Sequence, residues 1–164
     1  MTGIRAETGS DIAGIDRLLR ACFEGSDEAA LVAALRDAGD LSLSLVAEEA
    51  GRIVGHVGFS PLTIESHPDA RYHALAPLAV ARGWRRRGIG AQLAGAGLER
   101  LAAAGADGAV VLGDPAYYQR FGFRADAAEK LVCPWSGPYL QVLRFGDVAH
   151  APAGKLGYAR AFGA

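Results

Sequence analysis

The chain has 164 residues, of which 51% are hydrophobic and 21% charged, so it is long enough and apolar enough for one domain with a buried core. The formal net charge of -1 argues against a nucleic-acid-binding protein, because such proteins usually carry an excess of basic residues. The sequence shows neither a signal-peptide core nor a long apolar span, so we expect a cytoplasmic protein that does not contact membranes. Cys22 and Cys133 are too few for a disulfide framework, and no metal-ligand spacing indicates a metal site.

The first forty residues predict a short strand and two helices. The strand lies at 4–6, and the first helix follows the capping pair Ser10 and Asp11 and extends to about Phe23. Apolar residues recur at helical spacing along this segment, which is typical of an amphipathic helix packed on a core. A second helix of the same kind is expected to follow Ser26 and to end at 37–40.

The next segment predicts a hairpin and a further strand. Apolar runs at 41–48 and 53–64 surround a turn that contains Gly51, which indicates two antiparallel strands. A polar loop at 65–71 leads into a strand at 72–80. Within that strand Pro77 cannot donate a ladder hydrogen bond, so it indicates either an edge strand or a place where pairing opens at a bulge.

The remaining elements alternate between helix and strand. A helix is expected at 90–104, and the apolar run at 108–112 is typical of a buried strand that lies parallel to the preceding one across that helix. Asp114 and Pro115 resemble the cap and first turn of a short helix that ends near Gly122. Strands around 131–133 and 139–145 complete a mixed sheet.

The turn between the strand at 72–80 and the helix at 90–104 has the features of an anion site. Arg85, Arg86 and Arg87 supply positive charge, and Gly88 and Gly90 let a backbone approach a ligand closely. The helix that follows adds unpaired N–H groups and the positive end of its dipole. The segment lacks the Gly-Lys-Ser/Thr of a P-loop and the third glycine of a dinucleotide fingerprint.

Two motifs resemble those of one family, the GNAT superfamily of N-acetyltransferases. The spacing Arg85-x-x-Gly88-x-Gly90 resembles its Gln/Arg-x-x-Gly-x-Gly/Ala motif. The segment at 118–123, Tyr-Gln-Arg-Phe-Gly-Phe, resembles its Tyr-x-Lys/Arg-x-Gly-Phe element. The order of expected elements also matches. The chain departs from the pattern just before the second motif, where Val111 and Asp114 stand in place of the usual Asn and Ala.

The resemblance implies a fold and a reaction. The fold is an α/β GNAT fold, with a mixed, mostly antiparallel twisted sheet whose central parallel pair splays at a bulge, flanked by helices. Residues 1–145 would form this domain, and the tail at 146–164, which predicts no element, would pack on it. The reaction transfers an acetyl group from acetyl-CoA to a primary amine of a small molecule or protein by direct attack in a ternary complex. Acetyl-CoA is then the co-substrate, no metal is needed, and a homodimer is one expected assembly.

The resemblance also assigns the co-substrate contacts. The backbone of Leu78, Ala79 and Val80 would hydrogen-bond the pantetheine arm, and an N–H nearby would polarise the thioester carbonyl. Arg85 matches the first position of the first motif, and either Arg82 or Arg86 would reach the 3′-phosphate. The pyrophosphate would lie in a cradle of backbone N–H groups from Arg86, Arg87, Gly88, Ile89, Gly90 and Ala91.

Catalytic roles are assigned less directly. Tyr118 matches the tyrosine that in many family members protonates the departing thiolate, although it could also be a core aromatic. A base must accept a proton from the amine, and the candidates are His73, which titrates in the useful range, and Asp114, which follows a parallel strand. A partly buried polar residue and a helix cap are the ordinary interpretations of these two, and a water relay is a third route. Cys133 is better explained as a structural thiol than as a nucleophile.

Two other functional classes remain open at the level of sequence. A coenzyme A-binding sensor without turnover would explain the lack of an obvious base. A nucleic-acid-contacting module would use the arginine turn, but the net charge of -1 argues against it.

Overall fold

The computed structural model describes residues 2–146 and 151–163, which group into two compact units. Unit 1 comprises Met1–Phe59 and Ala76–Glu99, and unit 2 comprises Ser60–Leu75 and Arg100–Ala164. Three long elements contribute a segment to each unit. They are β3 (Arg52–Ile64), β4 (Tyr72–Val80) and α3 (Ile89–Ala103).

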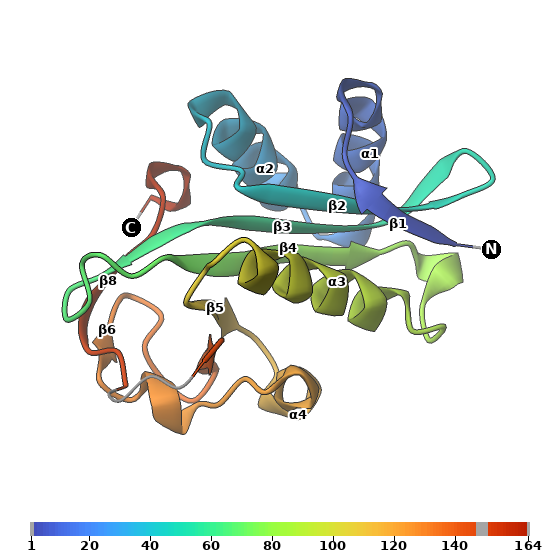
Figure 1. Ribbon diagram of the computed structural model, residues 1–164. Helices are drawn as coiled ribbons and strands as arrows, with labels where there is room; N and C mark the ends of the chain where they lie inside the picture. The colour runs from blue at the N-terminus through green and yellow to red at the C-terminus, as the bar shows by residue number, and fades with distance from the viewer. Residues whose placement is uncertain (1, 147–150, 164) are drawn as a thin grey trace. The chain divides into compact units, whose positions relative to one another are not determined.

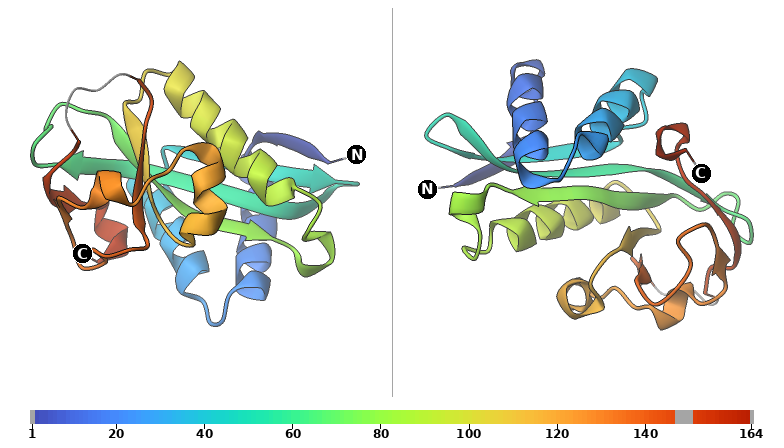
Figure 2. Two further views of the ribbon diagram at one scale, coloured as in Figure 1. Left: turned by 90° about the horizontal axis from the view of Figure 1, so that it is seen from below. Right: turned by 180° about the vertical axis from the view of Figure 1, so that it is seen from behind.

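Unit 1 has helices on both faces of an antiparallel group of strands. β1 (Gly3–Ala6) pairs with β2 (Leu43–Glu49), β2 pairs with β3, and β3 neighbours β4. The helices α1 (Ile12–Cys22) and α2 (Asp27–Ala38) cover one face, and the first turns of α3 cover the other (Figures 1 and 2). The predicted hairpin of β2 and β3 is therefore confirmed, as are both early helices.

Helical spacing of apolar residues explains how α1 and α2 pack. The buried side chains of α1 are Ile15, Leu18 and Leu19. Their spacing of three and four positions from Ile15 places them on one face of the helix. The α2 helix ends at Gly39, whose left-handed conformation (φ 76°) suits a residue without Cβ. The buried cluster beneath these helices contains Ile15, Leu18, Leu19, Ala29, Val32, Val46 and Ala79.

On the opposite face, two glycines let α3 approach β3 closely. A Cβ added at Gly55 of β3 would lie 2.8 Å from Cδ1 of Leu93, and one added at Gly97 of α3 would overlap the ring of Phe59. No real side chain fits at such separations without a shift of its neighbours. The segment of α3 in unit 1 is therefore fixed against β3 by direct backbone approach.

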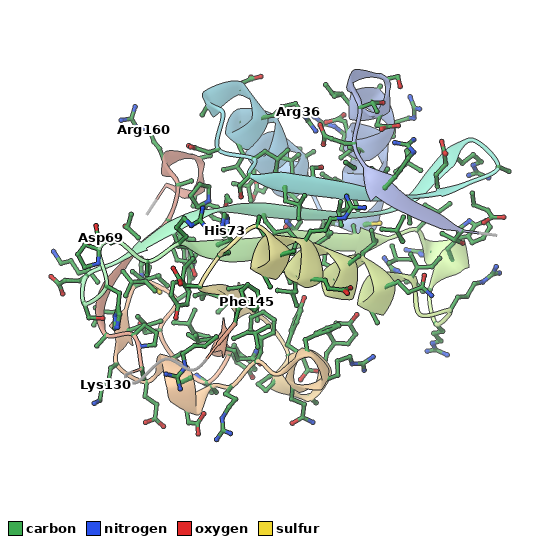
Figure 3. The ribbon with its side chains drawn as sticks, viewed as in Figure 1. Arg36, Asp69, His73, Lys130, Phe145 and Arg160 are labelled. Atoms are coloured by element: carbon green, nitrogen blue, oxygen red, sulfur yellow. The ribbon has the colours of Figure 1, made fainter. Side chains whose placement is uncertain are left out.

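A network of polar side chains joins α2 to the strands of unit 1, and it is buried at Ser44 and His56 but only partly buried at Arg36 and Glu7. Arg36 of α2, labelled in Figure 3, donates from Nε and Nη2 to the two carboxylate oxygens of Glu7, each at 3.0 Å. Ser44 Oγ donates to Glu7 Oε1, and Ser44 Oγ lies 2.9 Å from His56 Nε2. Because the single hydroxyl proton of Ser44 goes to the carboxylate, His56 Nε2 must carry the imidazole proton. His56 Nδ1 is then an acceptor, buried without a partner among the described residues.

Burial affects the ionisation of two residues of this polar network, His56 and Glu7. Burial lowers the pKa of His56 from 6.5 to about 4, against a smaller opposing effect of Glu7. For Glu7, burial alone would raise the pKa, but the hydrogen bonds from Arg36 and Ser44 outweigh it and the net pKa is lowered. At neutral pH this polar network therefore links the neutral imidazole of His56 to the ion pair of Arg36 and Glu7.

Unit 2 is built around the parallel pair of β4 and β5. β5 (Gly108–Leu112) pairs in parallel with the start of β4 and antiparallel with β7 (Leu140–Arg144). β8 (Gly154–Gly157) pairs with the end of β3 and, in parallel, with β6 (Leu131–Val132). The core of this unit contains Leu62, Ile64, Tyr72, Ala74, Val110, Ala128, Leu131, Leu140, Val142 and Leu156.

The predicted fold class is confirmed, with two differences in detail. The short helix after β5 is a single α-turn, α4 (Pro115–Tyr118), followed by a 3-10 turn at Gln119–Phe121 and Gly122 at φ 97°. The strand β8 was not predicted, because a four-residue segment bounded by two glycines has little strand propensity of its own. Its neighbours β3 and β6 impose the strand conformation. Residues 147–150 and 164 of the predicted tail lie outside the described residues.

The neutral state of His56 predicts a loss of stability in mild acid. The unfolded chain binds a proton near pH 6.5 and the folded chain only near pH 4, so the free energy of unfolding falls as the pH drops through this window. By pH 4 the loss approaches about 3 kcal/mol. Denaturant unfolding of wild type and His56→Gln between pH 6.5 and 5 should show a flatter dependence in the variant.

His67→Gln in the loop after β3 controls for the substitution itself. The window from pH 6.5 to 5 also lies above the range in which Glu7 and Asp11, whose pKa values are lowered, take up protons. Equal slopes for wild type and His56→Gln would show that His56 is not kept neutral by burial.

The close approach of α3 to β3 predicts opposite effects for two glycines on the same helix. Gly97→Ala should destabilise the protein by about 1–3 kcal/mol, since its methyl group would collide with Phe59. Gly95→Ala should stabilise it by about 0.5–1 kcal/mol, because nothing lies within 4 Å of the added atom and alanine favours the helix. Thermal unfolding measures both, and a melting temperature raised by Gly97→Ala would contradict the packing.

Candidate functional site

The loop from β4 to α3 is tied to the strands at its start. Ala81 donates its backbone N–H to the carbonyl of Val54 on β3 at 2.8 Å. A 3-10 turn then spans Arg82–Trp84, and Arg85 Nε donates to the carbonyl of Val80 at 2.9 Å. These bonds fix the point at which the chain leaves β4. The loop therefore enters α3 from a defined position within unit 1.

Two residues of this loop adopt the left-handed conformation. Arg86 has φ 64° and Gly88 has φ 80°, and such alternation turns successive N–H groups toward one side. The left-handed region is uncommon for a residue with a Cβ, so Arg86 carries backbone strain of the kind found at binding sites. A Cβ added at Gly88 would meet nothing within 4 Å, which leaves open space beside this backbone.

The N-terminus of α3 follows directly. Gln92 donates its N–H to the carbonyl of Gly88 at 3.0 Å, which closes the first helical turn. The N–H groups of Ile89, Gly90 and Ala91 precede that bond and have no partner within the helix. Together with the positive end of the dipole of this 15-residue helix, they present a positive potential of the kind that suits an anion.

The arginines of the loop are exposed to solvent. All four of its arginines have exposed side chains, namely Arg82, Arg85, Arg86 and Arg87. A bound phosphate could therefore reach their charges. The guanidinium of Arg87 stacks over the ring of Trp84 at 4.7 Å from its centroid, a cation–π contact that orients it. Trp84 was not singled out in the sequence, and only its position inside the arginine run could have indicated this role.

The parallel register of β4 with β5 covers Tyr72, His73 and Ala74, whereas β4 itself continues past Pro77 to Val80. The Ala76–Pro77 peptide bond is cis, and Pro77 is buried.

Strand alternation decides which β4 groups point away from β3. The N–H of Ala81 is bonded to β3, and backbone groups of successive strand residues point to opposite sides, so those of Ala79 face β3 as well. The groups of Leu78 and Val80 then point to the other side. The Val80 carbonyl accepts from Arg85 Nε at 2.9 Å and from Cys22 Sγ at 3.4 Å.

In unit 2, Tyr118 ends the one-turn helix α4 and lies in an aromatic cluster. Its ring meets those of Tyr117 and Phe123 edge to face, with centroids 5.0 and 5.9 Å away, and it is tilted against Phe121 at 6.2 Å. Burial, with a smaller contribution from Tyr117, raises the pKa of Tyr118 to about 12. The hydroxyl therefore keeps its proton at neutral pH and can act as a donor.

The two base candidates have different surroundings. Asp114 is exposed, and its Oδ1 accepts the N–H of Ala116 at 2.9 Å, so the carboxylate caps α4. His73 is half-buried on β4 and is labelled in Figure 3. Burial, with a smaller effect of Arg71, lowers its pKa, so the imidazole is neutral at pH 7.

Residues 2–146 and 151–163 contain both cysteines, Cys22 and Cys133, as free thiols. Cys133 is half-buried, with its Sγ 3.9 Å from Ser136 Oγ. In the same residues no group of three or more His, Cys, Asp or Glu side chains could hold a metal ion. None of the described helices is long and apolar enough to cross a membrane.

Comparison with known proteins identifies the family. Residues 12–123 match the family model described as the acetyltransferase (GNAT) family. The chain belongs to the GNAT acetyltransferase family. A curated relative, the uncharacterized N-acetyltransferase YhbS of Escherichia coli K12, is 44% identical to this GNAT chain over 149 residues, which cover 89% of each. YjhQ of the same strain, also named an uncharacterized N-acetyltransferase, is 37% identical over 124 residues, 74% of this chain and 68% of YjhQ.

Solved structures agree with this assignment. The crystal structure of YhbS from Escherichia coli in complex with CoA superposes with a TM-score of 0.92 at 41% identity, covering 99% of this chain and 92% of that one. A GNAT family acetyltransferase from Brucella melitensis in complex with acetyl-CoA gives a TM-score of 0.84 at 38% identity, covering 99% and 98%. The resemblance inferred from the two motifs is therefore confirmed.

The structure divides the predicted site residues of this GNAT domain between the two units. All predicted co-substrate contacts, from Leu78 to Val80 and from Arg85 to Ala91, lie in unit 1. Tyr118, His73 and Asp114 lie in unit 2. Sequence reasoning missed Gly113 and Gln141, which surround the start of α4, because neither a glycine after a strand nor a glutamine within one carries a motif.

Proposed function

We propose that this protein is an acetyl-CoA-dependent N-acetyltransferase that transfers an acetyl group to a primary amine by direct attack in a ternary complex. The observation that carries the proposal is the β4–α3 loop, whose left-handed residues Arg86 and Gly88 lead into the free N-terminus of α3. It is supported by two relatives, 41% and 38% identical, whose crystal structures contain CoA and acetyl-CoA.

The chain's own groups suit the parts of acetyl-CoA. The backbone groups of Leu78 and the N–H of Val80, which point away from β3, would hydrogen-bond the pantetheine arm. The open space beside Gly88 and the N–H groups at 86–91 would receive the pyrophosphate. Arg85 would act mainly by holding the loop, because its Nε is bonded to Val80, whereas the exposed Arg82 or Arg86 would meet the 3′-phosphate.

The reaction needs one proton removed and one supplied. The amine nitrogen forms a bond to the thioester carbonyl carbon, the carbon–sulfur bond breaks, and the sulfur leaves with its electron pair. A backbone N–H near Leu78 would polarise the carbonyl. Tyr118 would donate its hydroxyl proton to the sulfur, and His73 would accept a proton from the amine.

His73 is preferred to Asp114 as the base for a structural reason. The carboxylate of Asp114 is engaged with the N–H of Ala116, and protonating it would weaken the cap of a one-turn helix. His73 is neutral at pH 7 and half-buried, and a proton on its imidazole would not weaken a helix cap. A water molecule would serve equally well as an intermediate carrier.

Product formation tests the proposed function. Acetyl-CoA and a panel of primary amines (spermidine, an aminoglycoside, free amino acids and a lysine peptide) are incubated with the protein, and the released thiol and the acetylated product are measured. Acetylated amine formed in proportion to thiol supports the proposal. Tight acetyl-CoA binding without any product across the panel would instead support a coenzyme A-binding sensor.

The assignment of Tyr118 predicts a selective kinetic defect. Tyr118→Phe should lower kcat by roughly 100-fold or more, because the departing sulfur loses its proton donor, while the Kd for acetyl-CoA stays unchanged. Thiol release measures the first quantity and calorimetry the second. Tyr117→Phe, which removes the neighbouring hydroxyl, is the matched control, and wild-type turnover in Tyr118→Phe would remove the proposed role.

A further inference from the structure

Gln141 of β7 is a polar side chain with an unusual place in unit 2. It is fully buried (0% exposed) and belongs to the strand that pairs with β5. Its Nε2 donates to the carbonyl of Gly113 at 3.0 Å and to the carbonyl of Tyr139 at 3.2 Å. Both acceptors need N–H donors, so the amide must present its nitrogen to them and turn its oxygen away.

This orientation leaves Oε1 of Gln141 buried with no partner among the described residues. Such an orphaned acceptor costs roughly 1–3 kcal/mol, so an apolar residue of similar volume would ordinarily be the more stable choice. Gln141 is therefore poorly explained as simple core packing. One of its two donated bonds goes to Gly113, and the other goes to the carbonyl of Tyr139, which itself accepts the N–H of Gly113.

Gly113 is the backbone corner where β5 turns into α4. Its carbonyl accepts from Gln141, and its N–H donates to the carbonyl of Tyr139 at 3.0 Å. Both backbone groups of Gly113 are thus tied to β7. A Cβ added at Gly113 would lie 2.6 Å from Cε2 of Tyr118, so the tyrosine ring rests directly on this glycine.

The helix that carries Tyr118 cannot fix the ring by itself. α4 has four residues, and a single turn is not stable in isolation because nucleation costs more than one turn returns. It is held by the Asp114 cap at its start, and Tyr118 donates its N–H to the Asp114 carbonyl at 3.0 Å. The position of the ring therefore depends on the corner immediately before Asp114.

We propose that Gln141 is a positioning residue for the acetyl transfer, which holds the Gly113 corner so that the Tyr118 hydroxyl has one fixed place. Only glutamine combines this reach with two N–H donors and no charge. Glutamate would place lone pairs against two carbonyl oxygens, and leucine or methionine would offer no donor. The inference rests on the proposed function, because it takes Tyr118 to be the proton donor.

Tyrosine-selective NMR tests the positioning without any acceptor amine. With ring-¹³C tyrosine, the Tyr118 resonance is the one lost in Tyr118→Phe, and the chain contains five tyrosines in all. Gln141→Met, which keeps the volume and removes both donors, should shift or broaden the Tyr118 resonance. Gln119→Met, the same change at an exposed neighbour of Tyr118, should leave it sharp and nearly unshifted. An unchanged Tyr118 resonance in Gln141→Met would overturn the proposal.

Kinetics separate positioning from general damage. Gln141→Met should lower kcat about tenfold or more with little change in KM for acetyl-CoA, since a displaced donor costs rate rather than binding. In a Tyr118→Phe background the same change should cause no further loss. Equal losses in both backgrounds would mean that Gln141 acts independently of Tyr118.

Failure of the proposed proton donor and failure of the Gln141 variant to fold are each distinguishable from failure of the positioning role. If Tyr118→Phe alone retains full turnover, the proposed proton donor fails, whatever Gln141 does to the NMR signal. If Gln141→Met does not fold, Gly113→Ala is used in its place. Its added methyl group would lie 2.6 Å from Cε2 of Tyr118 and would therefore displace the ring. Gly113→Ala should then shift the Tyr118 resonance and lower kcat, and a wild-type spectrum and rate would overturn the proposal.

Discussion

The sharp reversal of the backbone between β4 and α3 is the constraint on which the candidate site depends. Left-handed residues at Arg86 and Gly88 turn the chain so that the first N–H groups of α3 stay free. The reversal is held at one end by the bond from Arg85 to Val80, and at the other by the close packing of Ile89 and Leu93 against Gly55 of β3. Because both ends are fixed, the backbone of the proposed anion site is already in place before a ligand arrives, which would reduce the entropy lost on binding.

Unit 2 solves a different physical problem. Its proposed proton donor stands on a single helical turn, which has too few internal hydrogen bonds to hold a side chain in place. The structure compensates with tertiary contacts, namely a capping carboxylate at Asp114, an aromatic cluster around Tyr118, and a glycine corner tied to β7 by Gln141. In this unit Oε1 of Gln141 is buried without a partner among the described residues, while Nε2 of the same amide donates to the carbonyl of Gly113.

Most of the fold and part of the candidate site could be predicted from the sequence, and the division has a physical basis. Regular patterns were sufficient for α1, for the hairpin and for the loop at Arg85–Gly90, because spacing and residue type act locally there. Gln141 and β8 could not be found in this way, since the meaning of a glutamine in a strand, or of a glycine-bounded strand, comes from its neighbours. Trp84 likewise gains its role only through the guanidinium stacked on it.

Calorimetric titration with acetyl-CoA is the most direct test of the central claim, that the reversal between β4 and α3 holds the pyrophosphate. Wild type should bind with a Kd on the order of micromolar. Gly88→Glu places a negative charge in the open space that the negatively charged pyrophosphate would occupy, and it should weaken binding at least about 100-fold. Gly83→Glu adds the same charge to the same loop outside the cradle and should bind nearly as wild type does. Absence of binding by the wild type, or equal affinity of Gly88→Glu, would contradict the account.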